Sequence, residues 1–144
     1  MTQKTSESHI LVSMTYISRA NPDMSDEAFS DILRQAQENN VKNGITGMLI
    51  FNNYYFLQTI EGSRAQLNHL LGNLVNDPRH YDLQLLETRE LKGKGREWSR
   101  WSMNLALPST DNAALYLKYS TTAEFNPYLL SAESIRELMT ELNH

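Results

Sequence analysis

A glutamine stands in the middle of an apolar run that is typical of a buried strand. The run extends from Tyr54 to Gly62, and one face of such a strand carries Tyr54, Phe56, Gln58 and Ile60. An amide has two donors and two acceptor lone pairs, and a buried polar group left unpaired costs about 1–3 kcal/mol. Gln58 therefore needs a hydrogen-bonding partner, which is another side chain, a water or a ligand.

Further polar side chains fall on the apolar faces of two other predicted elements. Tyr16 lies on one face of an alternating run over 10–18, and Asn39 and Asn40 end the apolar stripe of a predicted helix. Each has a structural explanation when taken alone: a core tyrosine bonded to a backbone carbonyl, and two amides that end a helix. Together, one phenol and three amides could surround a polar ring system with a carbonyl, an imide N–H and a ring nitrogen.

Two further pairs of residues could belong to a ligand site, but each pair also has an ordinary structural explanation. Arg79 and His80 lie in a predicted turn after a helix, where a solvated surface is the ordinary explanation. Trp101 and Met103 share one face of a predicted strand, where they are first of all core residues. The joint placement of these residues, and not any single one, indicates a ligand site.

The elements that must position these side chains follow an alternating order. Strands are predicted at 10–18, 45–51, 54–60, 83–91 and 98–105, with helices that Ser25 and Ser63 cap between the first and second and between the third and fourth. We expect the first helix to stop near Asn40 and residues 52–53 to form a two-residue hairpin loop. Two more helices are predicted at 113–119 and after Ser131.

This order predicts an α+β fold, namely a ferredoxin-like βαββαββ sheet with two helices on one face. The two central strands of such a sheet are the first and the third, so Tyr16 and Gln58 are expected side by side, pointing toward the helices. The apolar stripes of the C-terminal helices need a surface to cover, and we expect that surface to be the other face of the sheet.

Composition excludes several classes of function. The 144 residues include no cysteine, which rules out disulfides, thiolate chemistry and cysteine-based metal sites, and we expect no metal site. A net charge of −4 argues against a nucleic-acid partner. The apolar runs are far shorter than the roughly 20 residues that a bilayer requires, and the polar start lacks a signal-peptide core. We therefore expect no membrane association and a cytoplasmic location.

The sequence also resembles a known family. The segments that carry the resemblance are Tyr16-Ile17-Ser18, Asn39-Asn40, Asn43-Gly44-Ile45-Thr46-Gly47, Phe56-Leu57-Gln58, Glu61-Gly62, Asp77-Pro78-Arg79-His80 and Trp101-Ser102-Met103. In this order they are similar to a BLUF domain, the flavin-binding blue-light sensor. Residues 1–8 are polar, and we expect them to be disordered. The resemblance implies a BLUF domain over 9–107 and a C-terminal helical extension over 108–144, as in short stand-alone members of the family.

The resemblance also implies roles for the candidate residues. Tyr16 would donate an electron and a proton to the photoexcited flavin, and Gln58 would bridge the phenol to the flavin and rearrange after the transfer. Asn40 would bind the carbonyl and imide side of the ring, with Asn39, Arg79 and His80 nearby. Trp101 and Met103, which the resemblance also places among the photoactive residues, would transmit the change in hydrogen bonding toward the C-terminal helices.

Two departures from the family pattern are visible. Asn73 stands where some relatives have a basic residue, and Trp98 stands where phenylalanine is common. The sequence also lacks a G-x-G-x-x-G or P-loop motif, so the adenine and phosphates of FAD have no dedicated cradle, and FMN or riboflavin could bind too.

We therefore expect a non-enzymatic photoreceptor that binds FAD non-covalently and signals through contacts with itself, as a homo-oligomer, or with a separate downstream protein. Two other functions stay open. One is a flavin-dependent redox enzyme, although no nicotinamide-binding fingerprint is present. The other is a ligand-free interaction module, because the ferredoxin-like fold hosts many functions.

Overall fold

The computed structural model of the chain describes residues 10–92, 95–98, 104–106, 109, 112–120 and 124–142. Over these residues the order of elements is β1 (Leu11–Ala20), α2 (Asp26–Asn43), β2 (Thr46–Phe51), β3 (Tyr55–Ser63), α3 (Arg64–Val75), β4 (His80–Glu90), β5 (Asn104–Ala106), α4 (Ala113–Tyr119), the 3₁₀ turn η1 (Pro127–Leu129) and α5 (Ala132–Leu142). The segment 1–8, for which disorder is predicted, lies outside the described residues.

The strands form one sheet in the order β4-β1-β3-β2-β5. β1, β3, β2 and β4 pair antiparallel, whereas β5 pairs parallel to β2. The predicted α+β, ferredoxin-like fold is confirmed, with β1 and β3 as the neighbouring central strands. Parallel pairing of β5 places residues 104–106 beside Met48, Leu49 and Ile50.

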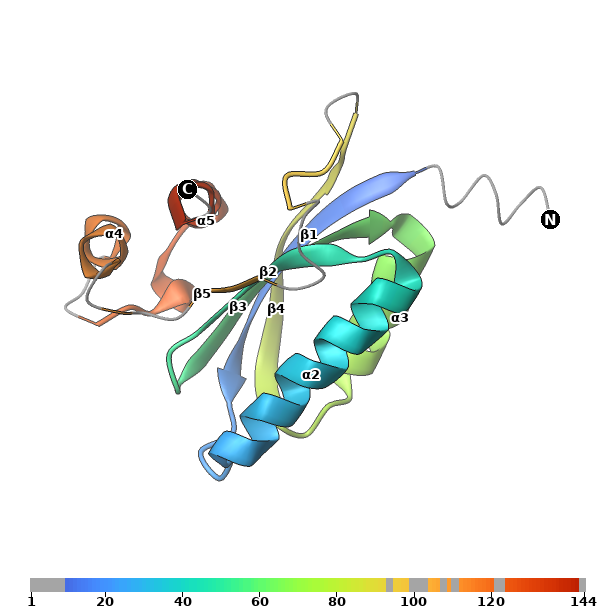
Figure 1. Cartoon of the computed structure of the whole chain (residues 1–144). Coiled ribbons are helices and arrows are strands. Elements are labelled where there is room, and N and C mark those ends of the chain that lie inside the picture. Colours follow the sequence, from blue (N-terminus) through green and yellow to red (C-terminus); the bar gives the residue numbers. More distant parts are fainter. Residues whose placement is uncertain are drawn as a thin grey trace.

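The sheet separates two apolar layers, each covered by its own helices (Figure 1). On the α2 and α3 side, Met14, Leu49 and Phe56 are buried beneath Phe29 and Ile32 of α2. The other layer combines strand residues with side chains of the C-terminal helices, and its most buried members include Ile17, Met48, Leu57, Ile135, Leu138 and Met139. The expectation that the C-terminal helices cover the free face of the sheet is confirmed. The limits 9–107 and 108–144 stay predictions.

The helix ends follow the sequence signals closely. The Ser25 side chain accepts a hydrogen bond from the Ala28 N–H at the start of α2, and Ser63 accepts one from the Gln66 N–H at the start of α3. These caps pair backbone donors that a helix start leaves free. At the other end of α2, Gly44 has φ 66°, and its N–H donates to the Asn40 carbonyl.

Several predicted limits are wrong by a few residues. α2 continues past Asn40 to Asn43, because the backbone stays helical until Gly44. β4 begins at His80 instead of 83, because β1 extends to Ala20 and gives those residues a pairing partner. In the hairpin only Asn53 has positive φ, 75°, and Tyr54 is 67% exposed instead of sharing the strand's inward face.

The predicted fifth strand over 98–105 is also wrong at its two ends, and residues 99–103 lie outside the described part of the chain. The described strand covers Asn104–Ala106, and Trp98 lies in an irregular segment, 95–98, outside the sheet. The prediction that Trp101 and Met103 share a strand face falls outside the described residues. Within the part of the chain that the structure describes, no helix combines the length and apolar character needed to cross a bilayer.

Candidate functional site

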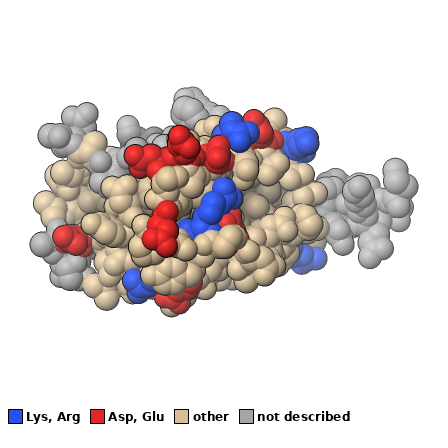
Figure 2. Space-filling model, turned by 90° about the horizontal axis from the view of Figure 1, so that it is seen from below, with Lys and Arg blue, Asp and Glu red and all other residues tan. Residues whose placement is uncertain are grey.

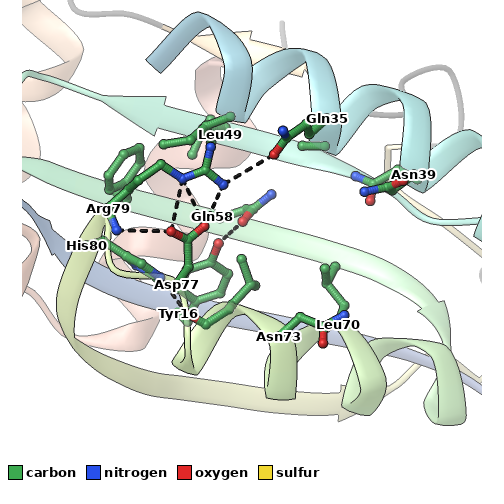
Figure 3. Close-up of a pocket in the computed structure, with 15 residues that line it drawn as sticks. Tyr16, Gln35, Asn39, Leu49, Gln58, Leu70, Asn73, Asp77, Arg79 and His80 are labelled. Carbon is green, nitrogen blue, oxygen red and sulfur yellow. Dashed lines mark hydrogen bonds and ion pairs between the residues drawn. The ribbon is translucent and has the colours of Figure 1, made fainter. Parts of the chain in front are cut away.

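A phenol and an amide meet at the centre of the sheet. Tyr16 of β1 and Gln58 of β3 are direct register partners, and the Tyr16 O–H donates to Gln58 Oε1. Both side chains are buried, at 4% and 5% exposure, and both point toward α2 and α3 (Figure 3). The side-by-side arrangement expected from the alternating pattern is therefore present.

These two side chains line a cavity of about 200 Å³ between the sheet and the two helices (Figure 3). Its apolar lining comes from α2, α3 and the sheet, and includes Ile32, Ala36, Leu49, Phe56, Leu70 and Leu74. Its polar lining includes all the residues predicted to bind a cofactor: Tyr16, Asn39, Asn40, Gln58, Arg79 and His80. The structure thus brings this set to one place, and its role in binding stays a prediction.

The two asparagines of α2 differ in exposure. Asn40 is 1% exposed, whereas Asn39 is exposed, although both line the cavity. The buried Asn40 also stands at the end of α2, where its backbone carbonyl accepts hydrogen bonds from Gly44 and Ile45. Its position is consequently fixed by the helix terminus, while Asn39 lies where the cavity meets solvent.

An ion pair lies beside the cavity at the exit of α3. Arg79 Nη2 donates to Asp77 Oδ2 at 2.6 Å and Nε donates to Oδ1 at 2.9 Å. The hydrogen bonds from Arg79 hold the pKa of Asp77 below its ordinary value. Arg79 Nη2 also donates to Gln35 Oε1 of α2 at 3.3 Å, so the guanidinium bridges the two helical elements (Figure 3).

Sequence reasoning did not single out Asp77 or Gln35 as functional residues. The signal for Asp77 was available, because a carboxylate two residues from a guanidinium across a proline turn is well placed for pairing. Gln35 gave no signal of its own: it is one of several polar residues on α2.

His80 is fixed on both ring nitrogens. Nε2 lies 2.6 Å from the Leu74 carbonyl oxygen, and Nδ1 lies 2.7 Å from Ser18 Oγ. A carbonyl can only accept, so Nε2 carries a proton, and in the neutral ring Nδ1 accepts from the Ser18 hydroxyl. The ring also packs edge-on against Phe56. His80 is therefore a fixed wall of the cavity and not the solvated turn residue of the ordinary interpretation.

The Tyr16 phenol is held in its neutral form. Burial raises the pKa of Tyr16 well above its ordinary value, and the nearby negative charge of Asp77 acts in the same direction. A neutral phenol hydrogen-bonded to an amide can release an electron and a proton together. The amide can exchange donor for acceptor without a change of charge.

The cavity as a whole suits a flat, partly polar ring. Its helical and sheet walls offer apolar side chains, and amide and phenol groups gather at the sheet and at the end of α2. Pockets of this kind, apolar with a few converging polar groups, are characteristic of cofactor sites. Among the described residues, no cluster of His, Asp and Glu could hold a metal ion.

Comparison with known proteins agrees with this arrangement. The family described as "Sensors of blue-light using FAD", BLUF, matches residues 11–104. Photoactivated adenylate cyclase subunit beta of Euglena gracilis is 34% identical over 96 residues, which are 67% of this chain and 11% of that protein. The blue light- and temperature-regulated antirepressor BluF of Escherichia coli is 28% identical over 74 residues, 51% of this chain and 18% of that protein.

Solved structures give the same result over more of the chain. The ground state of BlsA superposes with a TM-score of 0.83 at 29% identity, covering 92% of this chain and 87% of that one. The dark-state structure of BlrB, a BLUF protein, superposes with a TM-score of 0.74 at 26% identity, covering 92% and 96%. The chain spans about a tenth of the length of the photoactivated cyclase subunits that it matches. On the extent of the family match and on the fold, this chain belongs to the BLUF family of blue-light sensors.

Proposed function

We propose that this chain is a blue-light photoreceptor that binds FAD non-covalently in the cavity between α2, α3 and the sheet. The observation that carries the proposal is the Tyr16–Gln58 hydrogen bond, which lies in the wall of that cavity. Membership of a family of blue-light sensors supports the same conclusion.

The residues present fit a flavin ring. Apolar side chains from both helices and from the sheet can sandwich the ring, while Asn40 and Gln58 supply buried amides for its carbonyl and imide edge. Asn39, Arg79 and His80 surround the same space. When bound, the flavin absorbs blue light and becomes a strong oxidant.

The chain's own residues then perform the switch. With a photoexcited flavin bound as the oxidant, Tyr16 would give up an electron together with its O–H proton, and Gln58 Oε1 is the group that already accepts a hydrogen bond from that O–H. The Gln58 amide rearranges by rotation or tautomerisation, and the electron and proton return to Tyr16. The rearranged amide would present a donor where an acceptor stood before, and an added hydrogen bond from it would shift the absorption of a bound flavin to the red.

The output is an altered set of protein contacts and not the conversion of a substrate. We propose that the chain signals as a homo-oligomer or to a separate downstream protein, with Trp101 and Met103 passing on the change. On the face shown in Figure 2, Lys and Arg are interspersed with Asp and Glu. We propose that nucleic acid is not a partner, because the net charge of the chain is −4.

The decisive experiment is an absorption spectrum of the purified protein in the dark and after blue illumination. We expect a flavin spectrum whose main band shifts to the red in the light and recovers slowly in the dark. Protein that lacks flavin and cannot take up any would favour a ligand-free interaction module. Rapid reduction of the bound flavin by NAD(P)H would favour a redox enzyme instead.

The proposed oligomer needs its own measurement. Light scattering of the flavin-loaded protein should give a mass above that of one chain, and illumination should change the distribution of species. A monomer in both the dark and the light would remove the homo-oligomer from the proposal and leave a separate partner as the output.

A further inference from the structure

A buried carboxylate stands on the strand that carries Gln58, three residues further on. Glu61 of β3 is 1% exposed and does not line the cavity. Because side chains alternate along a strand, Glu61 and Gln58 point to opposite faces of the sheet. Glu61 is therefore on the side of the C-terminal helices, and the mechanism above does not use it.

Two of the hydrogen bonds to the Glu61 carboxylate come from a segment outside the sheet. Its Oε2 accepts from the Glu97 N–H at 2.8 Å, and its Oε1 accepts from the Trp98 N–H at 3.0 Å. Thr46 Oγ1 of β2 donates to Oε1 at 3.2 Å. Arg96 Nη1 donates to Thr46 Oγ1 at 3.2 Å and to the Glu61 backbone carbonyl at 3.4 Å.

This arrangement attaches the described segment 95–98 to β3 through one side chain. A buried carboxylate is costly to desolvate unless it is hydrogen-bonded. The two backbone N–H groups and the Thr46 hydroxyl offset this cost for Glu61. The backbone N–H groups of Glu97 and Trp98 make no ladder hydrogen bond, because neither residue belongs to a strand. The Glu61 carboxylate supplies the acceptors that a neighbouring strand would otherwise provide for these two N–H groups.

The attached segment delivers Trp98 into the core beneath the C-terminal helices. Trp98 is 3% exposed and belongs to the same buried cluster as Leu57 of β3 and Leu138 and Met139 of α5. Leu57 is the neighbour of Gln58 in the chain. A contiguous set of packed groups thus runs from the strand of Gln58, through the Glu61 carboxylate and Trp98, to α5.

We propose that Glu61 is a positioning residue of the light response: by holding the backbone of Glu97 and Trp98 to β3, it couples rearrangement at Gln58 to α5. The inference rests on the photoreceptor function proposed above. It differs from the role of Trp101 and Met103, because the coupling group is a carboxylate on β3 and the side chain that it positions is Trp98. Because proximity alone does not establish coupling between two sites, the light response of α5 itself has to be measured.

Glu61→Gln is the test variant, because it keeps the shape of the side chain but replaces one acceptor oxygen with an NH₂ group. That group faces a backbone N–H donor and cannot accept from it. The matched control is Glu97→Gln, which makes the same chemical change on an exposed side chain whose backbone N–H keeps its bond. Both proteins are loaded with FAD and compared with the wild type.

The first readout is amide hydrogen exchange in the dark, followed by NMR. In Glu61→Gln we expect at least one of the Glu97 and Trp98 amides to exchange about tenfold or more faster than in the wild type and in Glu97→Gln. Unchanged exchange of both amides would show that Glu61 does not hold the segment, and the proposal would be overturned.

The second readout separates coupling from structural support. We expect illumination to change the exchange of α5 amides in the wild type and in Glu97→Gln. In Glu61→Gln we expect that light-dependent change to fall by about threefold or more, although the dark flavin spectrum and the size of the red shift match those of the wild type. A folded Glu61→Gln protein with the full α5 response contradicts the proposal, as does a wild type that shifts to the red without any change in α5.

A milder variant covers the case in which Glu61→Gln does not fold. Thr46→Val removes one donor to the carboxylate and one acceptor of Arg96, and it leaves both backbone bonds, so we expect a smaller loss of the α5 response in the same direction. A full response in Thr46→Val would then overturn the proposal. If the wild type itself shows no red shift, it is the photoreceptor function that fails, while exchange in the dark still reports on whether Glu61 holds the segment.

Discussion

At the residue scale, the Tyr16 hydroxyl and the Gln58 amide have separate tasks that two substitutions can isolate. Tyr16→Phe keeps the ring and removes the O–H that donates to Gln58, and Gln58→Leu removes the amide. We expect both proteins to bind flavin and to lose the slow red-shifted state entirely, because the transfer or the rearrangement is missing. Absorption spectra before and after blue light provide the measurement.

Tyr54→Phe is the matched control for the first substitution. Tyr54 is 67% exposed in the hairpin, so loss of its hydroxyl should leave the light response intact. A Tyr16→Phe protein that cycles like Tyr54→Phe would show that the role given to the Tyr16 phenol is wrong.

The neutral state of Tyr16 also predicts a dependence of stability on pH. Burial raises the pKa of Tyr16 above its unfolded value near 10, so at alkaline pH the unfolded chain binds fewer protons than the folded one. Relative to Tyr16→Phe, the wild type should keep a constant free energy of unfolding from pH 6 to 9 and lose about 1.4 kcal/mol per pH unit above about pH 10. Urea denaturation of both proteins at each pH measures this difference. A difference that stays flat to pH 11 would mean that the phenol ionises equally in both states.

The residues of the site could be predicted to different degrees. Tyr16 and Gln58 follow from strand alternation, because a polar side chain on an apolar face is visible without coordinates. Asp77 is only two residues from Arg79, so its pairing with the guanidinium could have been inferred from the sequence. Gln35 is not predictable in this way, since its bond to Arg79 depends on how the exit of α3 turns toward α2. Glu61 was visible only as part of a motif, because its two backbone partners lie in an irregular segment that has no periodicity.

At the element scale, the backbones of β2 and β3 approach closely at Gly47, next to the part of β3 that carries Gln58. Gly47 of β2 pairs with Ile60, and a Cβ built at Gly47 would lie 2.2 Å from the Thr59 carbonyl oxygen. Because the clashing atom is backbone, the two strands would have to separate. We expect Gly47→Ala to lower the free energy of unfolding by at least about 2 kcal/mol and to weaken flavin binding.

Gly72→Ala is the control for that substitution. Gly72 lies within α3, where a Cβ meets no atom within 4 Å. Alanine there should stabilise the protein by about 0.5–1 kcal/mol, because glycine is a poor helix former. Urea denaturation of the two variants should therefore give midpoints on opposite sides of the wild type, and equal midpoints would contradict the close approach at Gly47.

The limits of elements were less predictable than their order. The apolar spacing identified each strand and helix, but pairing partners decided the ends: β4 begins early because Ala20 of β1 pairs with His80. Likewise, α2 runs on to Asn43 because only Gly44 adopts the left-handed backbone that ends it.

At the scale of the whole molecule, one sheet separates the cavity from the layer formed with the C-terminal helices. The apolar stripe of α5 predicted that this helix covers a surface, and burial of Ile135, Leu138 and Met139 against the sheet confirms it. The part that could not be predicted is the attachment of 95–98, since a side-chain carboxylate, and not a strand pattern, makes it. The sheet is thus the element that both sides of the molecule share.

This architecture predicts how different flavins stabilise the protein. The cavity of about 200 Å³ offers its amides and phenol to a ring, and the sequence has no glycine-rich phosphate motif. A ligand that binds only the folded state stabilises it by about 2.7 kcal/mol at a hundred times its Kd. If the ring supplies most of the affinity, riboflavin, FMN and FAD at equal concentration should raise the unfolding temperature by similar amounts. Stabilisation by FAD alone would instead show that the phosphates and adenine carry the binding energy, and that contacts outside this cavity hold them.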